Sequence, residues 1–126
     1  MSIAALEYIA NLMQSVGVEY QYMRWNDNKP LPDCYFVGEY IETESTTKEE
    51  CGYQESTFIL RGFTRKTWML LEEAKEKIEN GVPKTAILDN GSGIAVFYSS
   101  ATIVPTSDAE LKSIKIDLNI QEWKVK

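Results

Sequence analysis

The stretch FILRGFTRKTWMLLEEAKEKIENGVP, from Phe58 to Pro83, predicts a strand that passes through a short break into an amphipathic helix. Thr64 is a suitable N-cap for this helix, and Gly81 followed by a proline is expected to end it. Met69 falls among the charged positions of the helical wheel, so we expect its side chain to be exposed. The apolar stripe on the opposite side comprises Trp68, Leu70, Leu71, Ala74 and Ile78.

The chain before this unit opens with a second amphipathic helix over residues 3–16. Ser2 is its expected N-cap, and Gly17 supplies the position that ends it. Val18–Trp25 is rich in aromatic residues and predicts a strand, and two prolines make residues 26–33 a loop. The expected apolar face of the first helix comprises Ile3, Leu6, Ile9, Ala10, Met13 and Val16.

Two further strands, Cys34–Thr43 and Tyr53–Phe63, are expected to form a long antiparallel hairpin with a polar tip. Residues 38–56 contain six glutamates and a single lysine, Lys48, so this segment carries −5 of the formal net charge of −6. The acidity of the chain is therefore local. The six glutamates are Glu39, Glu42, Glu44, Glu49, Glu50 and Glu55.

The C-terminal part predicts two more strands. The cluster DNGSG, Asp89–Gly93, is a turn that leads into the strand Ile94–Val104. Apolar and polar residues then alternate up to Gln121, after which the parity changes. This change predicts either a bulge near Gln121 or a terminus that leaves its own sheet. The apolar positions of the last strand are Ile114, Ile116, Leu118 and Ile120.

These elements predict an α+β fold in the order α-β-β-β-α-β-β, with a mostly antiparallel sheet and two helices on one of its faces. At 126 residues the chain is expected to be a single domain, residues 1–126. The net charge of −6 argues against a general nucleic-acid binder. No apolar run approaches the ~20 residues of a membrane-spanning helix, and no signal peptide is evident, so we expect an intracellular protein.

Catalytic signatures are missing from the sequence. The chain has no histidine, and Cys34 and Cys51 are expected to remain reduced thiols because the hairpin separates them beyond disulfide reach. Carboxylate pairs at Glu39/Glu42 or Glu49/Glu50 could act in acid–base chemistry or bind calcium, but a solvated hairpin is the favoured interpretation. The DNGSG turn precedes a strand, which favours a hairpin turn over a phosphate loop. We therefore expect a protein that is not an enzyme and uses no metal or cofactor.

Several residues are candidates for contacts with other chains. Arg61, Arg65 and Lys66 form the basic cluster of the sequence and could dock an acidic surface, although a solvated junction is the favoured interpretation. The aromatic residues exceed what a small core readily covers, and such residues are enriched at interfaces. They include Tyr20, Tyr22, Trp25, Trp68 and Trp123.

The whole-chain pattern resembles the tail terminator (tail completion, minor tail) proteins of long-tailed bacteriophages and prophages. The resemblance is carried by MSIAALEYIANLMQSV, the long polar hairpin, GYQESTFILRGFTRKTWMLLEEAKEKI, and the closing pair GIAVFYSSATIV and LKSIKIDLNIQEWKV. It implies a non-enzymatic virion protein that forms a homo-oligomeric ring on the end of the tail tube, with a hexamer as the expected form. Such a ring stops tube polymerisation and presents the surface that joins the head.

The same resemblance implies the partners and the surfaces. The partners would be other copies, the tail tube protein and a head–tail connector protein, with DNA only as passing cargo and no membrane. The protein would reside in the bacterial host cytoplasm during assembly and then in the virion tail. Glu39, Glu42, Glu44, Glu49 and Glu50 would face the ring lumen or a neighbouring subunit, and Arg61, Arg65, Lys66, Met69 and Trp123 would lie at interfaces.

Two other functions remain open. Head–tail neck components have similar small folds, so the chain could occupy another position in the particle. A small-ligand-binding regulatory domain is also compatible with the sequence, and a deep apolar pocket lined by Tyr20, Tyr22 and Trp25 would distinguish it.

Overall fold

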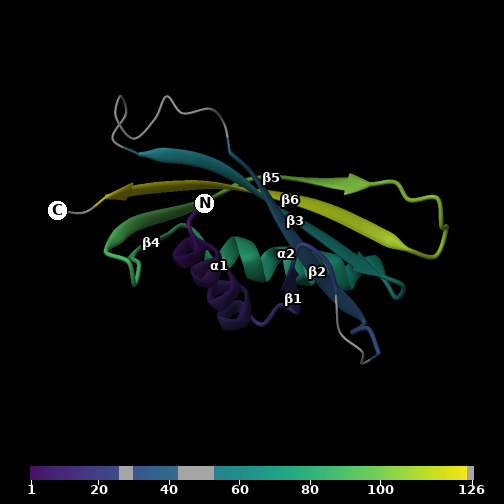
Figure 1. Ribbon diagram of the computed structural model, residues 1–126. Coiled ribbons are helices and arrows are strands. Elements are labelled where there is room, and N and C mark those ends of the chain that lie inside the picture. The colour runs from purple at the N-terminus through teal and green to yellow at the C-terminus, as the bar shows by residue number, and fades with distance from the viewer. Residues whose placement is uncertain (26–29, 43–52, 125–126) are drawn as a thin grey trace.

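The computed structural model describes residues 1–25, 30–42 and 53–124. Within these residues a curved, six-stranded sheet is accompanied by two helices (Figure 1). The elements are α1 (Ile3–Val16), β1 (Tyr20–Tyr22), β2 (Cys34–Glu42), β3 (Gln54–Thr64), α2 (Trp68–Gly81), β4 (Lys84–Ile87), β5 (Ser92–Val104) and β6 (Lys112–Lys124).

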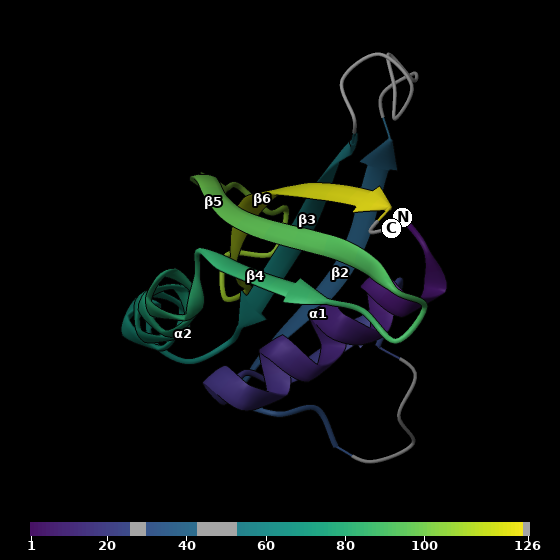
Figure 2. The ribbon, with the colours of Figure 1, turned by 90° about the vertical axis from the view of Figure 1, so that its left-hand side faces the viewer.

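The strand order in the sheet is β1-β2-β3-β6-β5-β4. All neighbouring strands pair antiparallel, except that β1 runs parallel to β2. Both helices lie beneath the same face of the sheet in Figure 1, and Figure 2 shows them side by side there. The predicted α+β class with a mostly antiparallel sheet is confirmed.

The core lies between this face of the sheet and the two helices. The central strands contribute alternate residues to it, because successive side chains of a strand point to opposite faces. Its largest fully buried side chains are Phe36, Phe58, Ile9, Met13, Leu60, Leu71, Ile78, Ile94, Ile116, Leu118, Ile120 and Val96. Two glycines leave room for aromatic rings in this layer: a Cβ on Gly62 would stand 2.4 Å from the ring of Phe36 on the opposite strand, and a Cβ on Gly38 would stand 2.6 Å from the ring of Phe58.

Both predicted ends of α1 are confirmed. The Ser2 hydroxyl accepts a hydrogen bond from the amide of Ala5 at 3.1 Å, and Gly17 adopts the left-handed conformation with φ of 83°. The predicted apolar face was partly wrong, because Ile3 is 75% exposed and Ala10 is also exposed. The face that packs on the sheet is rotated relative to the prediction and comprises Ala5, Ile9, Leu12 and Met13.

The predicted start of α2 was wrong by one turn. Thr67 is the N-cap, and its side chain makes no capping hydrogen bond. The Thr64 hydroxyl is instead occupied in the turn before the helix, where it donates to the Asp33 carbonyl at 2.6 Å and accepts from the Lys66 amide at 3.1 Å. The exposed Trp68 therefore stands in the first turn, outside the buried stripe of Leu71, Ala74 and Ile78.

Two strand predictions require correction at the sheet edges. The strand expected over Val18–Trp25 is only three residues long, from Tyr20 to Tyr22, because the chain turns at Met23, which has φ of 69°. The strand β4 was missed, so the element order contains one strand more than predicted. The DNGSG turn is confirmed as a hairpin turn: it joins β4 to β5, with the Leu88 amide donating to the Ser92 carbonyl at 2.7 Å.

Both alternatives for the end of the last strand were wrong, because β6 has no bulge near Gln121 and stays paired with β5 as far as Lys124. The strand β6 pairs with β3 without interruption from Lys112 to Glu122, and the irregularity of the sheet lies in β5 between Tyr98 and Ser100. The alternation of faces continues through Glu122, which occupies an inward position and is 5% exposed. The sequence pattern suggested a change in the alternation of apolar and polar residues because Glu122, a charged residue, occupies a core position.

Candidate assembly surfaces

The acidic hairpin is held by ion pairs within the chain where the structure describes it. On the sheet face away from the helices, Arg61 Nε lies 2.9 Å from Glu39 Oε1, between neighbouring strands. Glu42, at the end of β2, pairs with the amino group of Met1. Glu44, Glu49 and Glu50 lie outside the described residues. Arg61 therefore contacts the glutamate hairpin of its own chain.

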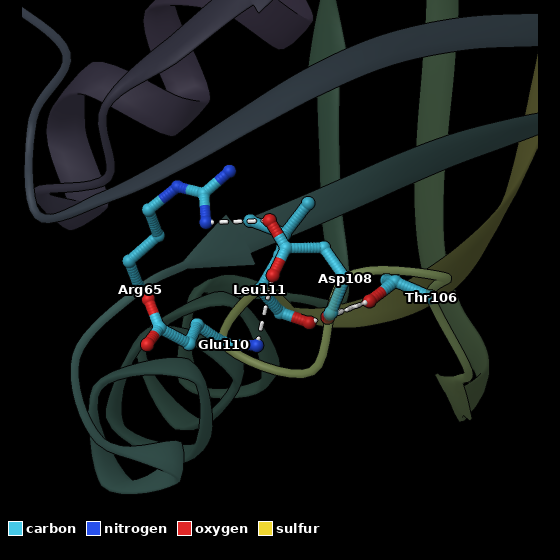
Figure 3. A network of polar contacts seen from close by, with 5 residues as sticks. All are labelled: Arg65, Thr106, Asp108, Glu110 and Leu111. Atoms are coloured by element: carbon cyan, nitrogen blue, oxygen red, sulfur yellow. Dashed lines mark hydrogen bonds and ion pairs between the residues drawn. The ribbon is translucent and has the colours of Figure 1, made fainter.

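A second polar network lies where β3 leads into α2, beside the turn between β5 and β6 (Figure 3). The guanidinium of Arg65 donates to Asp108 Oδ2 at 2.7 Å, and the Glu110 amide donates to Asp108 Oδ1 at 3.0 Å. The Thr106 hydroxyl lies 2.6 Å from the Asp108 carbonyl and 2.8 Å from the Leu111 carbonyl. The network ties a connecting turn to a junction 43 positions earlier in the chain.

The electrostatics of this network favour the ionised carboxylate. The hydrogen bond from Arg65 lowers the pKa of Asp108, and the backbone amide of Glu110 lowers it further. The same ion pair raises the pKa of Arg65. Both side chains are largely exposed, at 58% and 44% of their side-chain surface, so this is a surface pair that holds loop geometry.

A hollow of about 270 Å³ lies beside the network. Lys66, whose side chain has no acidic partner among the described residues, stands at its rim with Arg65. The hollow is lined by Leu31, Pro32, Asp33, Tyr35, Arg65, Lys66 and Leu111. Arg65 is already paired with Asp108, so Lys66 is the cation at this hollow that suits contact with an acidic surface.

The remaining predicted interface residues differ in accessibility. Met69 is 62% exposed, as expected for its position on the helical wheel. Trp123 is half-buried, and its indole covers Gly93 on the opposite strand, where a Cβ would stand 2.2 Å from the ring. Met69 is therefore available for contacts, whereas much of the Trp123 ring already packs within the sheet.

The aromatic pocket that would mark a small-ligand domain is not formed as expected. Tyr20 and Tyr22 border an open hollow of about 590 Å³, together with Ala10, Gln21, Met23 and Arg24. Trp25 is absent from that lining and packs against Tyr35, with ring centroids 5.3 Å apart. In the described parts of the chain, no group of three or more acidic or cysteine side chains is placed to hold a metal ion. Neither helix there is long and apolar enough to cross a membrane.

Sequence reasoning missed the contact between Glu122 and the start of α1. Glu122 Oε1 accepts from the Ser2 amide at 3.2 Å, and Oε2 accepts from the Ser2 hydroxyl at 2.9 Å. A glutamate in an otherwise apolar alternation was the available signal, because a buried carboxylate requires hydrogen-bond donors and a helix N-terminus supplies them.

Comparison with solved structures shows the same fold in other chains. One, from the virion of a native gene transfer agent particle, is 15% identical, with a TM-score of 0.62 over 96% of this chain and 94% of that chain. A second solved chain is 11% identical, with a TM-score of 0.64 over 98% of this chain and 93% of that chain. No family model matches the sequence, and no curated protein matches it.

Proposed function

We propose that this chain is a virion structural protein of the tail terminator type. In this role, copies assemble as a ring at the head-proximal end of the tail tube, stop its polymerisation and present the surface that joins the head. The observation that carries the proposal is the fold similarity to a chain of a gene transfer agent virion, which extends over 96% of this chain. The resemblance of the sequence to tail terminators supports the same assignment.

The distribution of charge supports a ring through which DNA passes. The hairpin segment carries −5 of the formal net charge of −6, and a lumen lined by such segments would repel the phosphate backbone. The basic residues Arg65 and Lys66 lie at the opposite end of β3 from this hairpin tip. Arg65 is paired with Asp108, whereas Lys66 is available to contact an acidic surface of the tube protein or the connector.

A head–tail neck or connector component is the second candidate, because such components have small folds similar to those of tail terminators and the solved chain of similar fold comes from a virion. The two roles differ in the partner that is bound first. A terminator binds the end of the tail tube in the absence of heads, whereas a neck component binds the connector and leaves tube length unchanged.

The test is a tube-capping experiment. Purified protein is mixed with polymerising tail tube protein, and tube lengths and ends are measured by electron microscopy. We expect shorter tubes with a ring on one end, and six-fold species in native mass spectrometry once rings form. An acidic protein of the same size serves as the control. Unchanged tube lengths together with bare tube ends would reject the terminator role.

A further inference from the structure

At each edge of the sheet, a short strand covers only part of its longer neighbour, and the uncovered parts of the two edges are complementary. At one edge, β1 covers only Phe36–Gly38 of the longer strand β2. At the other edge, β4 covers only Gly93–Val96 of β5 and leaves residues 97–104 without a neighbouring strand on that side. Figure 1 shows β5 continuing well beyond β4.

The register places these steps at matching levels. Following the pairs across the sheet, Gln21 of β1 lies in one row with Val37, Arg61, Lys115 and Thr102. That row contains β1 but has no residue of β4. The row through Lys84 of β4 contains Val96, Ile120, Ser56 and Glu42, and has no residue of β1. The first row therefore has an added strand only at the β1 edge, and the second row has one only at the β4 edge.

We propose that β1 of one copy of this chain pairs antiparallel with the uncovered part of β5, residues 97–104, in the next copy. This inference rests on the proposed ring and identifies the surface that joins its subunits. Within one sheet β1 and β5 already run in opposite directions, so copies that keep the same orientation bring these edges together antiparallel. A contact between two different edges is head-to-tail, the type that forms a ring when the rotation between neighbouring copies closes.

The side chains at both edges suit burial. Neither residues 20–23, YQYM, nor residues 97–104, FYSSATIV, contain a charge, whereas natural proteins protect unused edges with charged residues. Tyr22 and Met23 are 41% and 58% exposed at one edge, and Phe97 and Ile103 are 39% and 58% exposed at the other. Pairing of the edges would remove these apolar surfaces from water.

Space for the added strand exists on each side. Two hollows border β1, one of about 490 Å³ and one of about 590 Å³, and both include Ala10 and Tyr20 in their linings. Near the end of β5, Ile103 borders a hollow of about 310 Å³ together with Trp68 of α2. An inward-facing aromatic side chain of the neighbouring β1 would lie toward this last hollow.

Disulfide trapping tests the pairing. Gln21→Cys and Thr102→Cys are combined in a chain in which Cys34 and Cys51 are changed to serine. The two positions share a row of the sheet. Because the backbone of Gln21 faces β2, Gln21 would form a non-hydrogen-bonded pair with Thr102 of the neighbouring copy. The side chains of such a pair are close enough to favour a cross-strand disulfide. Mild oxidation of the assembled protein is expected to give a ladder of covalent multimers. Each single variant, and the matched pair Thr85→Cys with Thr102→Cys, is expected to give none.

The result separates the pairing from the proposed function. Multimers in native mass spectrometry without a covalent ladder would overturn the pairing and leave the ring proposal standing. If oxidation in the presence of tail tube ends also gives no covalent ladder, the pairing of β1 with β5 is overturned as well. A ladder from protein that does not cap tail tubes would support the pairing and reject the terminator role.

A charge placed at the edge gives a second measurement. Thr102→Lys is expected to weaken self-association at least about tenfold, because a lysine on an edge strand opposes strand addition. Thr85→Lys on β4 is the matched control, since it adds the same charge to an exposed strand outside the proposed contact. Thermal unfolding of the monomers is the control that checks whether both variants fold. Equal effects of the two substitutions on self-association would contradict the pairing.

Discussion

The Glu122 carboxylate accepts hydrogen bonds from both the amide and the hydroxyl of Ser2, which lies 120 positions earlier in the chain. Because the carboxylate is buried and faces the N-terminus of α1, it also interacts favourably with the helix dipole. We expect Glu122→Ala to lower the free energy of unfolding by about 2 kcal/mol, since buried hydrogen bonds to charged groups contribute about 1.5–3 kcal/mol. Urea denaturation measures the loss.

Glu55→Ala is the matched control for Glu122→Ala. Glu55 is exposed and lies on β3 opposite Gln121. The Glu55→Ala substitution therefore removes a glutamate from the same region without removing a buried contact. Its effect should remain within about 0.5 kcal/mol. Similar losses for the two variants would mean that the contact with Ser2 does not stabilise the fold.

The exposed pair of Arg65 and Asp108 predicts a pH dependence. The hydrogen bond from Arg65 lowers the pKa of Asp108 in the folded state below its ordinary value of 3.8. A lowered carboxylate pKa stabilises the fold at pH values above the ordinary one, and this contribution is lost as the pH falls through the folded-state value. Asp108→Asn should therefore be slightly less stable than the wild type at neutral pH, with the difference disappearing in acid.

Thermal unfolding of both proteins, from about pH 7 down to about pH 2, measures this difference. The Arg65→Gln variant should show the same loss at neutral pH, because it removes the same pair from the other side. A stability difference for Asp108→Asn that stays constant across the range would show that the ion pair contributes nothing.

At the scale of elements, the two helix starts differ in how they are capped. The Ser2 side chain bonds to the first turn of α1, whereas Thr67 takes the N-cap position of α2 without a side-chain bond. Ser2→Ala should cost about 1 kcal/mol or more, and Thr67→Ala only a few tenths, as measured by chemical denaturation. Thr67→Asp should stabilise the protein. Equal losses for the two alanine variants would contradict the difference in capping.

Elements whose signals are local were predictable from the sequence. Ser2 and Gly17 act on the backbone beside them, so both ends of α1 could be placed. The start of α2 could not, because the hydroxyl of Thr64 bonds to Asp33, 31 positions earlier in the chain. The strand β4, with the sequence KTAI, has no alternation of its own and exists through its pairing with β5.

The candidate surfaces show the same limit. The sequence grouped Arg61, Arg65 and Lys66 as one basic cluster because they are close along the chain. In the fold, Arg61 pairs across strands with Glu39, and Arg65 pairs with Asp108 in a distant turn. Exposure of Met69 followed from helical periodicity, whereas the contact of Glu122 with Ser2 depends on how the two ends of the described chain meet.

At the scale of the whole molecule, charge and sheet edges define separate surfaces. The uncharged edges of β1 and β5 suit contacts between copies, while residues 38–56 carry −5 of the formal net charge of −6. If copies form a ring by pairing β1 of one copy with β5 of the next, residues 38–56 take no part in that contact and can face the passing DNA. Assembly and DNA repulsion should therefore respond to different substitutions.

The variant Glu44→Lys/Glu49→Lys/Glu50→Lys tests this separation and leaves the pairs of Glu39 and Glu42 intact. It changes the formal net charge from −6 to zero, because each replacement adds two charges. We expect assembly equal to that of the wild type but salt-dependent binding of duplex DNA, measured by fluorescence anisotropy. Glu72→Lys/Glu73→Lys/Glu76→Lys on α2 makes the same change in net charge as a control. Equal DNA binding by both variants would reject an acidic lumen.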